Sequence, residues 1–336
     1  MTEVSYFCDA NWCEDFRCSK IISCEYIDSK LEVCPTDSMS KENRRYHYIE
    51  FGNGNFFGNK QSCPSNTKTL TTYREWLIYK CSYCFCLCDE GPRYMSDRYI
   101  NLRISMANIS DNRVVTGLRF IKHNKIIHLQ VQEGKLLERG YIDPKTVRWV
   151  PPENYKTIDK DIYEGQDYHT ISWEKRSIEL SEIVVEEGSV VTGVRFKKTS
   201  FGSLDLEVLI TEFNFNTGKL DAIPSWGFFK STPNLDIRHK FKHKVNLKSP
   251  DIPVRTKSFT DFSENMYIEF INTDYHKDAG QTTVPFFDAQ PVNSTIPTPL
   301  SGVGLFHKGR KGSGGFITPK IFTYDFSKHV NLISLG

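Results

Sequence analysis

One short segment alternates carboxylates with an imidazole, Asp274-Tyr-His276-Lys-Asp278. Alternate side chains of an extended backbone point to the same side, so these three groups could hold Ca²⁺ or Zn²⁺ with help from Asp288. The other interpretation is a polar loop whose aspartates cap their own backbone. We favour the loop, because calcium loops usually hold a denser set of acids. We therefore expect no cofactor, and Ca²⁺ is the ion to test first.

Catalytic chemistry has less support in the sequence. Asp167-Tyr-His169 could act as a charge-relay pair for a serine nucleophile. The chain has no Gly-x-Ser-x-Gly segment that would place such a serine on a sharp turn. A hydrolase built on Asp and His residues is therefore the weakest of our functional hypotheses, and we predict that the protein is not an enzyme.

A glycine-rich run, Gly309-Arg-Lys-Gly-Ser-Gly-Gly315, could contact an anion through its backbone N–H groups. It lacks the lysine–serine ending of a phosphate loop, so nucleotide binding is not expected. We interpret it instead as a flexible, exposed hairpin loop. Its candidate ligand-binding residues are Gly312, Ser313, Gly314 and Gly315.

The cysteines are confined to one end of the chain. An even number of cysteines at this density predicts a disulfide framework in an oxidising compartment. Cys81 and Cys84 also have the spacing of a zinc knuckle, but no second pair accompanies them, so we favour disulfides of open connectivity. The ten cysteines are Cys8, Cys13, Cys18, Cys24, Cys34, Cys63, Cys81, Cys84, Cys86 and Cys88.

Other features fit a secreted glycoprotein. Asn108-Ile-Ser110 and Asn293-Ser-Thr295 are potential N-glycosylation sites. No apolar run reaches the roughly 18 residues of a transmembrane helix, so no membrane span is expected. Met1–Ala10 lacks the pattern of a signal peptide. We therefore expect the leader to lie outside this sequence.

The composition narrows the possible partners. The 336 residues are 39% hydrophobic and 13% aromatic, enough for a sizeable core. A net charge of +2 is close to neutral and argues against nucleic-acid binding, which usually requires a concentrated basic face. We expect a glycan or an extracellular protein as the ligand, and a homo-oligomer is possible.

The distribution of residue types along the chain predicts two domains. Residues 1–90 hold all the cysteines and few periodic segments, and they predict a small disulfide-stapled module. Residues 91–336 alternate apolar and polar side chains, as in Ile127–Gln132 and Leu204–Val208. This pattern predicts strands with one buried face and one wet face.

Residues 91–336 also contain three copies of one pattern, each with a short first strand followed by a repeated segment. Three such units would form three sheets around a pseudo-threefold axis, with their apolar faces in one core. We therefore predict an all-β fold with a β-prism-like body, and a β-sandwich is the alternative. The glycine in each of the two Val-Thr-Gly-x-Arg-Phe segments would mark a bulge or bend. The repeated segments are Val114–Phe120, Val190–Phe196 and Leu300–Phe306, and their expected first strands are Tyr99–Leu102, Ser177–Leu180 and Tyr267–Phe270.

Several motifs resemble a family of secreted arthropod, chiefly insect, proteins of unknown function. The resemblance covers about residues 80–326 and implies no activity and no functional residues. Its motifs are the two Val-Val-Thr-Gly-x-Arg-Phe segments, Asp278-Ala-Gly-Gln-Thr-Thr-Val-Pro-Phe-Phe-Asp-Ala-Gln-Pro-Val292 and Leu300-Ser-Gly-Val-Gly-Leu-Phe-His-Lys-Gly309.

Ser200-Phe-Gly-Ser-Leu-Asp-Leu-Glu-Val208 is similar to the glycine-to-aspartate segment of jacalin-like β-prism lectins. The resemblance implies that Gly202 and Asp205 contact a sugar. Two residues separate them here, where the lectins have three, and the corresponding place in the first repeat holds His128. The first functional hypothesis is accordingly an extracellular binding protein with a lectin-like carbohydrate site. The alternative is a structural or self-assembling matrix protein.

Overall fold

The computed structural model shows an all-β protein whose helical segments are short 3₁₀ turns. The turns are η1 (Ile109–Asp111), η2 (Glu138–Gly140), η3 (Pro253–Arg255) and η4 (Ser327–His329). The described residues are 2–5, 18–27, 30–36, 46–58, 60, 63, 66–70, 74–75, 79–80, 83–90, 97–221, 223–227 and 242–329.

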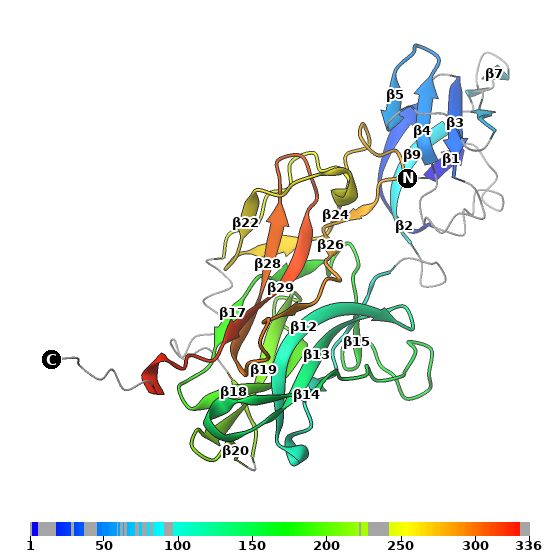
Figure 1. Cartoon of the computed structure of the whole chain (residues 1–336). Helices are drawn as coiled ribbons and strands as arrows, with labels where there is room; N and C mark the ends of the chain where they lie inside the picture. Colours follow the sequence, from blue (N-terminus) through cyan, green and yellow to red (C-terminus); the bar gives the residue numbers. More distant parts are fainter. Residues whose placement is uncertain are drawn as a thin grey trace.

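In the described part of the N-terminal region there are three small antiparallel sheets, drawn in blue and cyan in Figure 1. One has the order β1 (Thr2–Ser5), β9 (Tyr83–Glu90), β2 (Cys18–Ile27). Another has the order β5 (Phe56–Gly58), β4 (Tyr46–Phe51), β3 (Leu31–Pro35), β6 (Lys68–Leu70), and the third pairs β7 (Arg74–Glu75) with β8 (Tyr79–Lys80).

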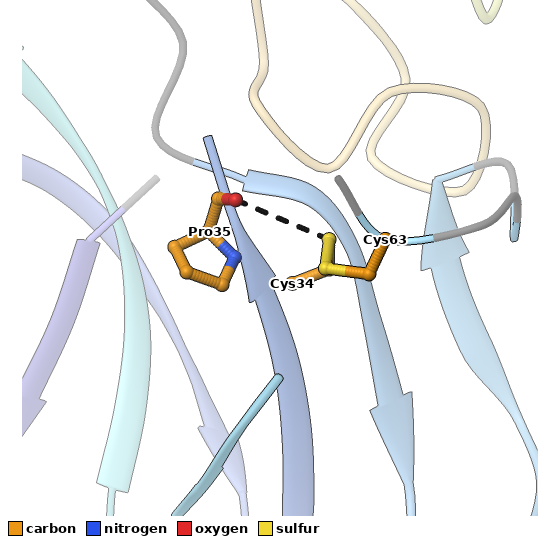
Figure 2. Close-up of a disulfide and its surroundings, with 3 residues drawn as sticks. All are labelled: Cys34, Pro35 and Cys63. Carbon is orange, nitrogen blue, oxygen red and sulfur yellow. Dashed lines mark hydrogen bonds between the residues drawn. A yellow bond between two sulfur atoms is a disulfide. The ribbon is translucent and has the colours of Figure 1, made fainter. Parts of the chain in front are cut away.

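A disulfide joins Cys34 of β3 to Cys63, with the two Cα atoms 5.8 Å apart (Figure 2). The Cys34 Sγ also lies 3.9 Å from the carbonyl oxygen of Pro35. This bridge confirms a disulfide in the cysteine-rich region. Of the other expected disulfide residues, Cys8, Cys13 and Cys81 lie outside the described residues, and only the backbone is described for Cys18, Cys24, Cys84, Cys86 and Cys88.

The body consists of three larger sheets. The first sheet has the order β15 (Tyr168–Thr170), β10 (Tyr99–Asn101), β13 (Ile126–Leu136), β12 (Arg113–His123), β27 (Val292–Asn293), with β14 (Ile142–Trp149) beside β13. The second has the order β11 (Ser105–Met106), β18 (Ser189–Lys198), β19 (Leu204–Asn214), β16 (Ser177–Glu179), β23 (Tyr267–Glu269), with β20 (Lys219–Leu220) and β21 (Ser225–Gly227) beside β19. The third has the order β17 (Glu182–Val184), β28 (Leu300–Gly309), β29 (Phe316–Thr323), β26 (Phe286–Phe287), with β22 (Asp261–Ser263) beside β28, and β24 (Ile271–Asn272) pairs separately with β25 (Thr283–Val284).

The three sheets follow one plan. Each is centred on a long antiparallel hairpin: β12–β13, β18–β19 or β28–β29. A short strand earlier in the same unit pairs in parallel with the second strand of the hairpin: β10 with β13, β16 with β19, and β26 with β29. This shared plan confirms the β-prism-like arrangement of three pseudo-repeated sheets.

The units are linked by exchanged strands. β11 leaves the first unit and pairs with β18 of the second, and β17 leaves the second and pairs with β28 of the third. β27 then returns from the third unit to pair with β12 of the first. The exchange is therefore circular, and every sheet receives a strand from the unit before it.

A glycine marks each point where an exchanged strand meets its hairpin. The β12–β13 and β18–β19 ladders shift register at Gly117 and Gly193, which confirms the predicted bulges, and the β28–β29 ladder also shifts at Gly302. A Cβ at Gly302 would lie 2.5 Å from the carbonyl oxygen of Ile183 on the exchanged strand. The glycine of each repeated segment thus leaves room for the neighbouring exchanged strand.

The inner faces of the three sheets share one apolar core. Phe120 of the first hairpin and Phe196 of the second stack with ring centroids 6.4 Å apart. Phe287 of the third unit packs on Phe120 at 4.7 Å. The predicted alternation of buried and wet positions is wrong at Gln130 of β13, which is buried and donates from Nε2 to the carbonyl oxygen of Val150 at 2.7 Å.

The expected first strand of the third unit was wrong. Tyr267–Glu269 forms β23, which pairs antiparallel with β16, just as β15 pairs with β10. It is therefore an outer neighbour of the second unit's first strand. The true equivalent is the two-residue strand β26, whose parallel pairing with β29 shows its place.

Candidate functional site

A cluster of hydrogen-bonded and charged side chains lies beside the Gly202–Asp205 segment in the second sheet. We call it the carboxylate–lysine cluster; its members are Glu179, Ser181, Ser203, Asp205 and Lys242. β16 ends at Glu179, and the parallel pairing of β16 with β19 brings it beside the start of β19, where Asp205 lies. Lys242 comes from a later segment of the chain.

The cluster is held by charge-assisted hydrogen bonds. The Lys242 Nζ lies 3.0 Å from a Glu179 carboxylate oxygen and donates to the Ser181 Oγ at 2.7 Å. The Ser203 Oγ donates to the other Glu179 oxygen at 3.0 Å. Glu179 is only 3% exposed. The ammonium therefore compensates a carboxylate that would otherwise be buried at high cost.

Asp205 is the more accessible carboxylate of the pair. Burial raises its pKa, and Lys242 and a hydrogen bond from the Ser181 hydroxyl oppose that rise. The Leu206 N–H donates to its Oδ1 at 2.8 Å. The carboxylates of Glu179 and Asp205 thus share the ammonium group of Lys242. Carboxylate oxygens can therefore still accept hydrogen bonds from the hydroxyl groups of a ligand.

The turn before Asp205 adds an exposed aromatic ring. Phe201 is 57% exposed. Gly202 has a φ of +84°, and a Cβ built there would meet no atom of the described residues within 4 Å. An aromatic face beside hydroxyl acceptors is the combination that binds sugars and other rings that are polar at the edge and apolar on the face.

The same strand position differs between the three units. His128 is the counterpart of Asp205, as the sequence predicted, because each lies in the ladder next to the partner of a core phenylalanine. Burial lowers the pKa of His128 to about 4. In the third unit the core position is held by Leu305, whose ladder partner is Pro319, so Thr318 holds the equivalent place and is also buried. Of the three equivalent positions, only the second unit has a carboxylate.

The Asp274–Asp278 segment serves as a structural loop. Asp278 is fully buried, and its carboxylate accepts from the Thr273 hydroxyl at 2.8 Å and the Thr282 N–H at 3.0 Å. The Asp274 Oδ1 accepts from the His276 N–H at 2.9 Å. The aspartates therefore cap their own loop. Within the described residues, no three His, Cys, Asp or Glu side chains gather as a metal site would require.

This capped loop holds the N-terminal region. Phe57 of β5 packs against Tyr275 with ring centroids 4.6 Å apart, and the Gly58 N–H donates to the Tyr275 carbonyl oxygen at 3.0 Å. Ala279 is buried in the same cluster. Figure 1 shows the chain beyond β24 reaching the β4–β5 end of the N-terminal sheets. The loop's apolar side chains complete a core that the small sheet cannot close by itself.

We expect Asp278→Ala to destabilise the protein by about 3 kcal/mol, because it leaves a buried hydroxyl and a buried N–H without an acceptor. Hydrogen exchange at the Gly58 amide should also become faster, since its acceptor lies in the loop. Asp274→Ala is the control and should cost about 1 kcal/mol, because it removes only the local turn bond from the His276 N–H. Unchanged exchange at Gly58 in Asp278→Ala would contradict this role.

The glycine-rich run is not the exposed loop that the sequence suggested. Ser313 is 4% exposed, and Gly314 and Gly315 are buried. The Gly314 N–H donates to the Asp251 carbonyl oxygen at 2.9 Å, and a Cβ at Gly315 would lie 2.2 Å from the Nε2 of His307. The glycines allow the chain to close over a buried imidazole. They are therefore packing residues, and only Gly312 and its exposed neighbours face solvent.

The charge-relay pair does not assemble. The Asp167 Oδ1 accepts from the Arg103 Nε at 2.7 Å, and its Oδ2 accepts from the Tyr163 N–H at 2.8 Å. The His169 Nε2 instead lies 3.2 Å from the carbonyl oxygen of Lys175. Each side chain thus has a local structural partner.

Among the described residues, no helix has the length and apolar character needed to cross a membrane.

A family model described as "Domain of unknown function (DUF4803)" matches residues 2–131. The match spans the N-terminal sheets and continues through β10, β11 and β12 into β13. It overlaps the span of the insect-family resemblance only at its start and does not reach the second repeat. No curated protein matches the chain. Over residues 2–131 the chain is similar to a family that brings no assigned activity.

Proposed function

We propose that this chain is a secreted, non-enzymatic binding protein that holds a carbohydrate at the 199–205 turn of its second sheet. The observations that carry the proposal are the partial exposure of the Asp205 carboxylate and the exposed ring of Phe201, which precedes it in the same short segment. The carboxylate can accept from two sugar hydroxyls, and the ring can cover the apolar face of a pyranose.

Other features support the extracellular part of the proposal. The Cys34–Cys63 bridge suits an oxidising compartment, and both Asn108 and Asn293 are exposed. We take residues 1–90 as a disulfide-stapled module that accompanies the binding body of residues 91–336. The ligand would then be a glycan, free or attached to an extracellular protein.

A glycan array probed with the full-length chain tests the proposal. We expect Asp205→Asn and Phe201→Ala each to weaken binding at least tenfold, because each removes one of the two sugar contacts. Phe262→Ala is the control, since Phe262 is also an exposed aromatic but lies on β22 of the third sheet. If the wild type binds no glycan, or if both variants bind normally, the proposal fails.

A further inference from the structure

A pocket of about 360 Å³ opens beside β11, where the chain leaves the first unit. Met106, Val150 and Pro151 give it an apolar wall, and Glu133 and Arg148 supply charged groups. Its size is within the range of small-ligand sites, roughly 300–1,000 Å³. We call it the β11 pocket; the remaining lining residues are Ala107, Asn108, Ile109 and Ser110.

The pocket is lined by a complete N-glycosylation triplet. Asn108 and Ser110 are both exposed and both lie on its wall. The Asn108 N–H donates to the Glu133 Oε2 at 2.8 Å, and its Oδ1 accepts from the Asp111 N–H at 3.3 Å. These two bonds fix the backbone and the acceptor end of the amide. Within the described part of the chain, the Nδ2, to which N-linked sugars attach, has no partner.

The charged groups of the pocket are fixed by the sheet. Glu133 on β13 is 2% exposed and accepts from the Arg148 Nε at 2.8 Å. The Arg148 side chain is otherwise exposed, so its remaining N–H groups can donate to a ligand. The apolar wall lies beside this donor. A pyranose with an N-acetyl group presents the same pairing of an apolar face and polar edges.

We propose that Asn108 carries an N-glycan whose first N-acetylglucosamine lies in the β11 pocket. In the transfer, the Nδ2 forms a bond to C1 of the sugar, the bond from C1 to the diphosphate of a lipid-linked oligosaccharide breaks, and the amide releases a proton. The protein is only the acceptor. The inference rests on the extracellular location in the proposed function, but it uses a different surface from the 199–205 turn.

Mass analysis of the peptide Ile104–Arg113 from the full chain, expressed in a eukaryotic secretory host, tests the modification. We expect a sugar mass on this peptide in the wild type and none in Ser110→Ala, which keeps Asn108 and its hydrogen bonds. Asn293→Gln is the control and should leave the modification at Asn108 unchanged. An unmodified Ile104–Arg113 peptide overturns the inference, and if Asn293 is modified in the same sample, the extracellular location survives.

A second measurement tests the pocket itself. The glycan is trimmed enzymatically to one N-acetylglucosamine, and the Tm is compared with that of sugar-free Ser110→Ala. We expect the trimmed protein to melt about 2 °C higher, a shift that corresponds to a contact of modest strength in a chain of this size. Met106→Ala should remove most of this difference, because it removes part of the apolar wall. An equal difference in Met106→Ala and in wild type would show a sugar in solvent and overturn the pocket assignment.

Discussion

Gly302→Ala is expected to destabilise the body by about 3 kcal/mol, the upper end of the cost of overpacking. The added Cβ would lie 2.5 Å from the Ile183 carbonyl oxygen and 3.0 Å from the Val184 Cα. Both atoms belong to the backbone of the exchanged strand β17, which cannot move aside without losing its ladder with β28. Chemical denaturation of the purified variant measures the loss.

The equivalent glycines give a graded series. A Cβ at Gly117 would meet the Asn293 Cβ at 2.8 Å, and one at Gly193 would meet the Met106 Cβ at 2.9 Å. Both substitutions should cost less than Gly302→Ala, because their nearest contacts are longer than the 2.5 Å contact at Gly302. Gly165→Ala is the control: it has a φ of +85° and open space, so only the left-handed backbone cost of about 1–2 kcal/mol is expected. A Gly302→Ala variant as stable as this control would argue against close strand exchange.

Lys242→Met should have a comparably large effect. It removes the ammonium that lies 3.0 Å from buried Glu179 and leaves two neighbouring carboxylates without their cation. Breaking a buried ion pair in this way typically costs about 3–5 kcal/mol. Lys244→Met is the matched control, because the Lys244 Nζ pairs with Glu269 at the surface and should contribute less than about 1 kcal/mol.

The effect of Lys242→Met should also depend on pH. Burial already raises the folded-state pKa of Asp205 above its unfolded value, so folding favours the protonated form and stability falls as pH rises through the folded pKa. Removing the opposing cation raises that pKa further. The stability difference between variant and wild type should therefore be smallest near about pH 4, the ordinary pKa of aspartate, and grow towards pH 7. A difference independent of pH would show that the loss comes from packing alone.

The sequence predicted those features that short segments determine. The Val-Val-Thr-Gly-x-Arg-Phe repeats indicated three related sheets, and their glycines indicated the bulges at Gly117 and Gly193. Both follow from local chemistry, because only glycine lacks the Cβ that would meet a neighbouring strand. The prediction of a capped loop around Asp278 similarly rests on the tendency of aspartate side chains to bond nearby backbone groups in turns.

The features that the sequence did not show depend on long-range pairing. Tyr267-Ile-Glu-Phe270 resembles a first strand in composition, but its place in the sheet depends on antiparallel pairing with β16. Lys242 lies in the basic run 238–244, but its pairing has no local signal, because its partners Glu179 and Ser181 are distant in the chain. The sequence also does not indicate Phe201 as a site residue, because the exposure of a side chain cannot be read from the sequence alone. The burial of Ser313 likewise depends on Asp251 and His307, which no motif connects to it.

The circular strand exchange affects how the protein is made. β12 is synthesised early, but its outer neighbour β27 belongs to the last unit. During translation one edge of the first sheet therefore stays unpaired until nearly the whole chain has left the ribosome. An open edge strand readily pairs with other chains. Premature termination anywhere before residue 292 would leave this edge unprotected, so truncated products should aggregate even when their own hairpins have formed.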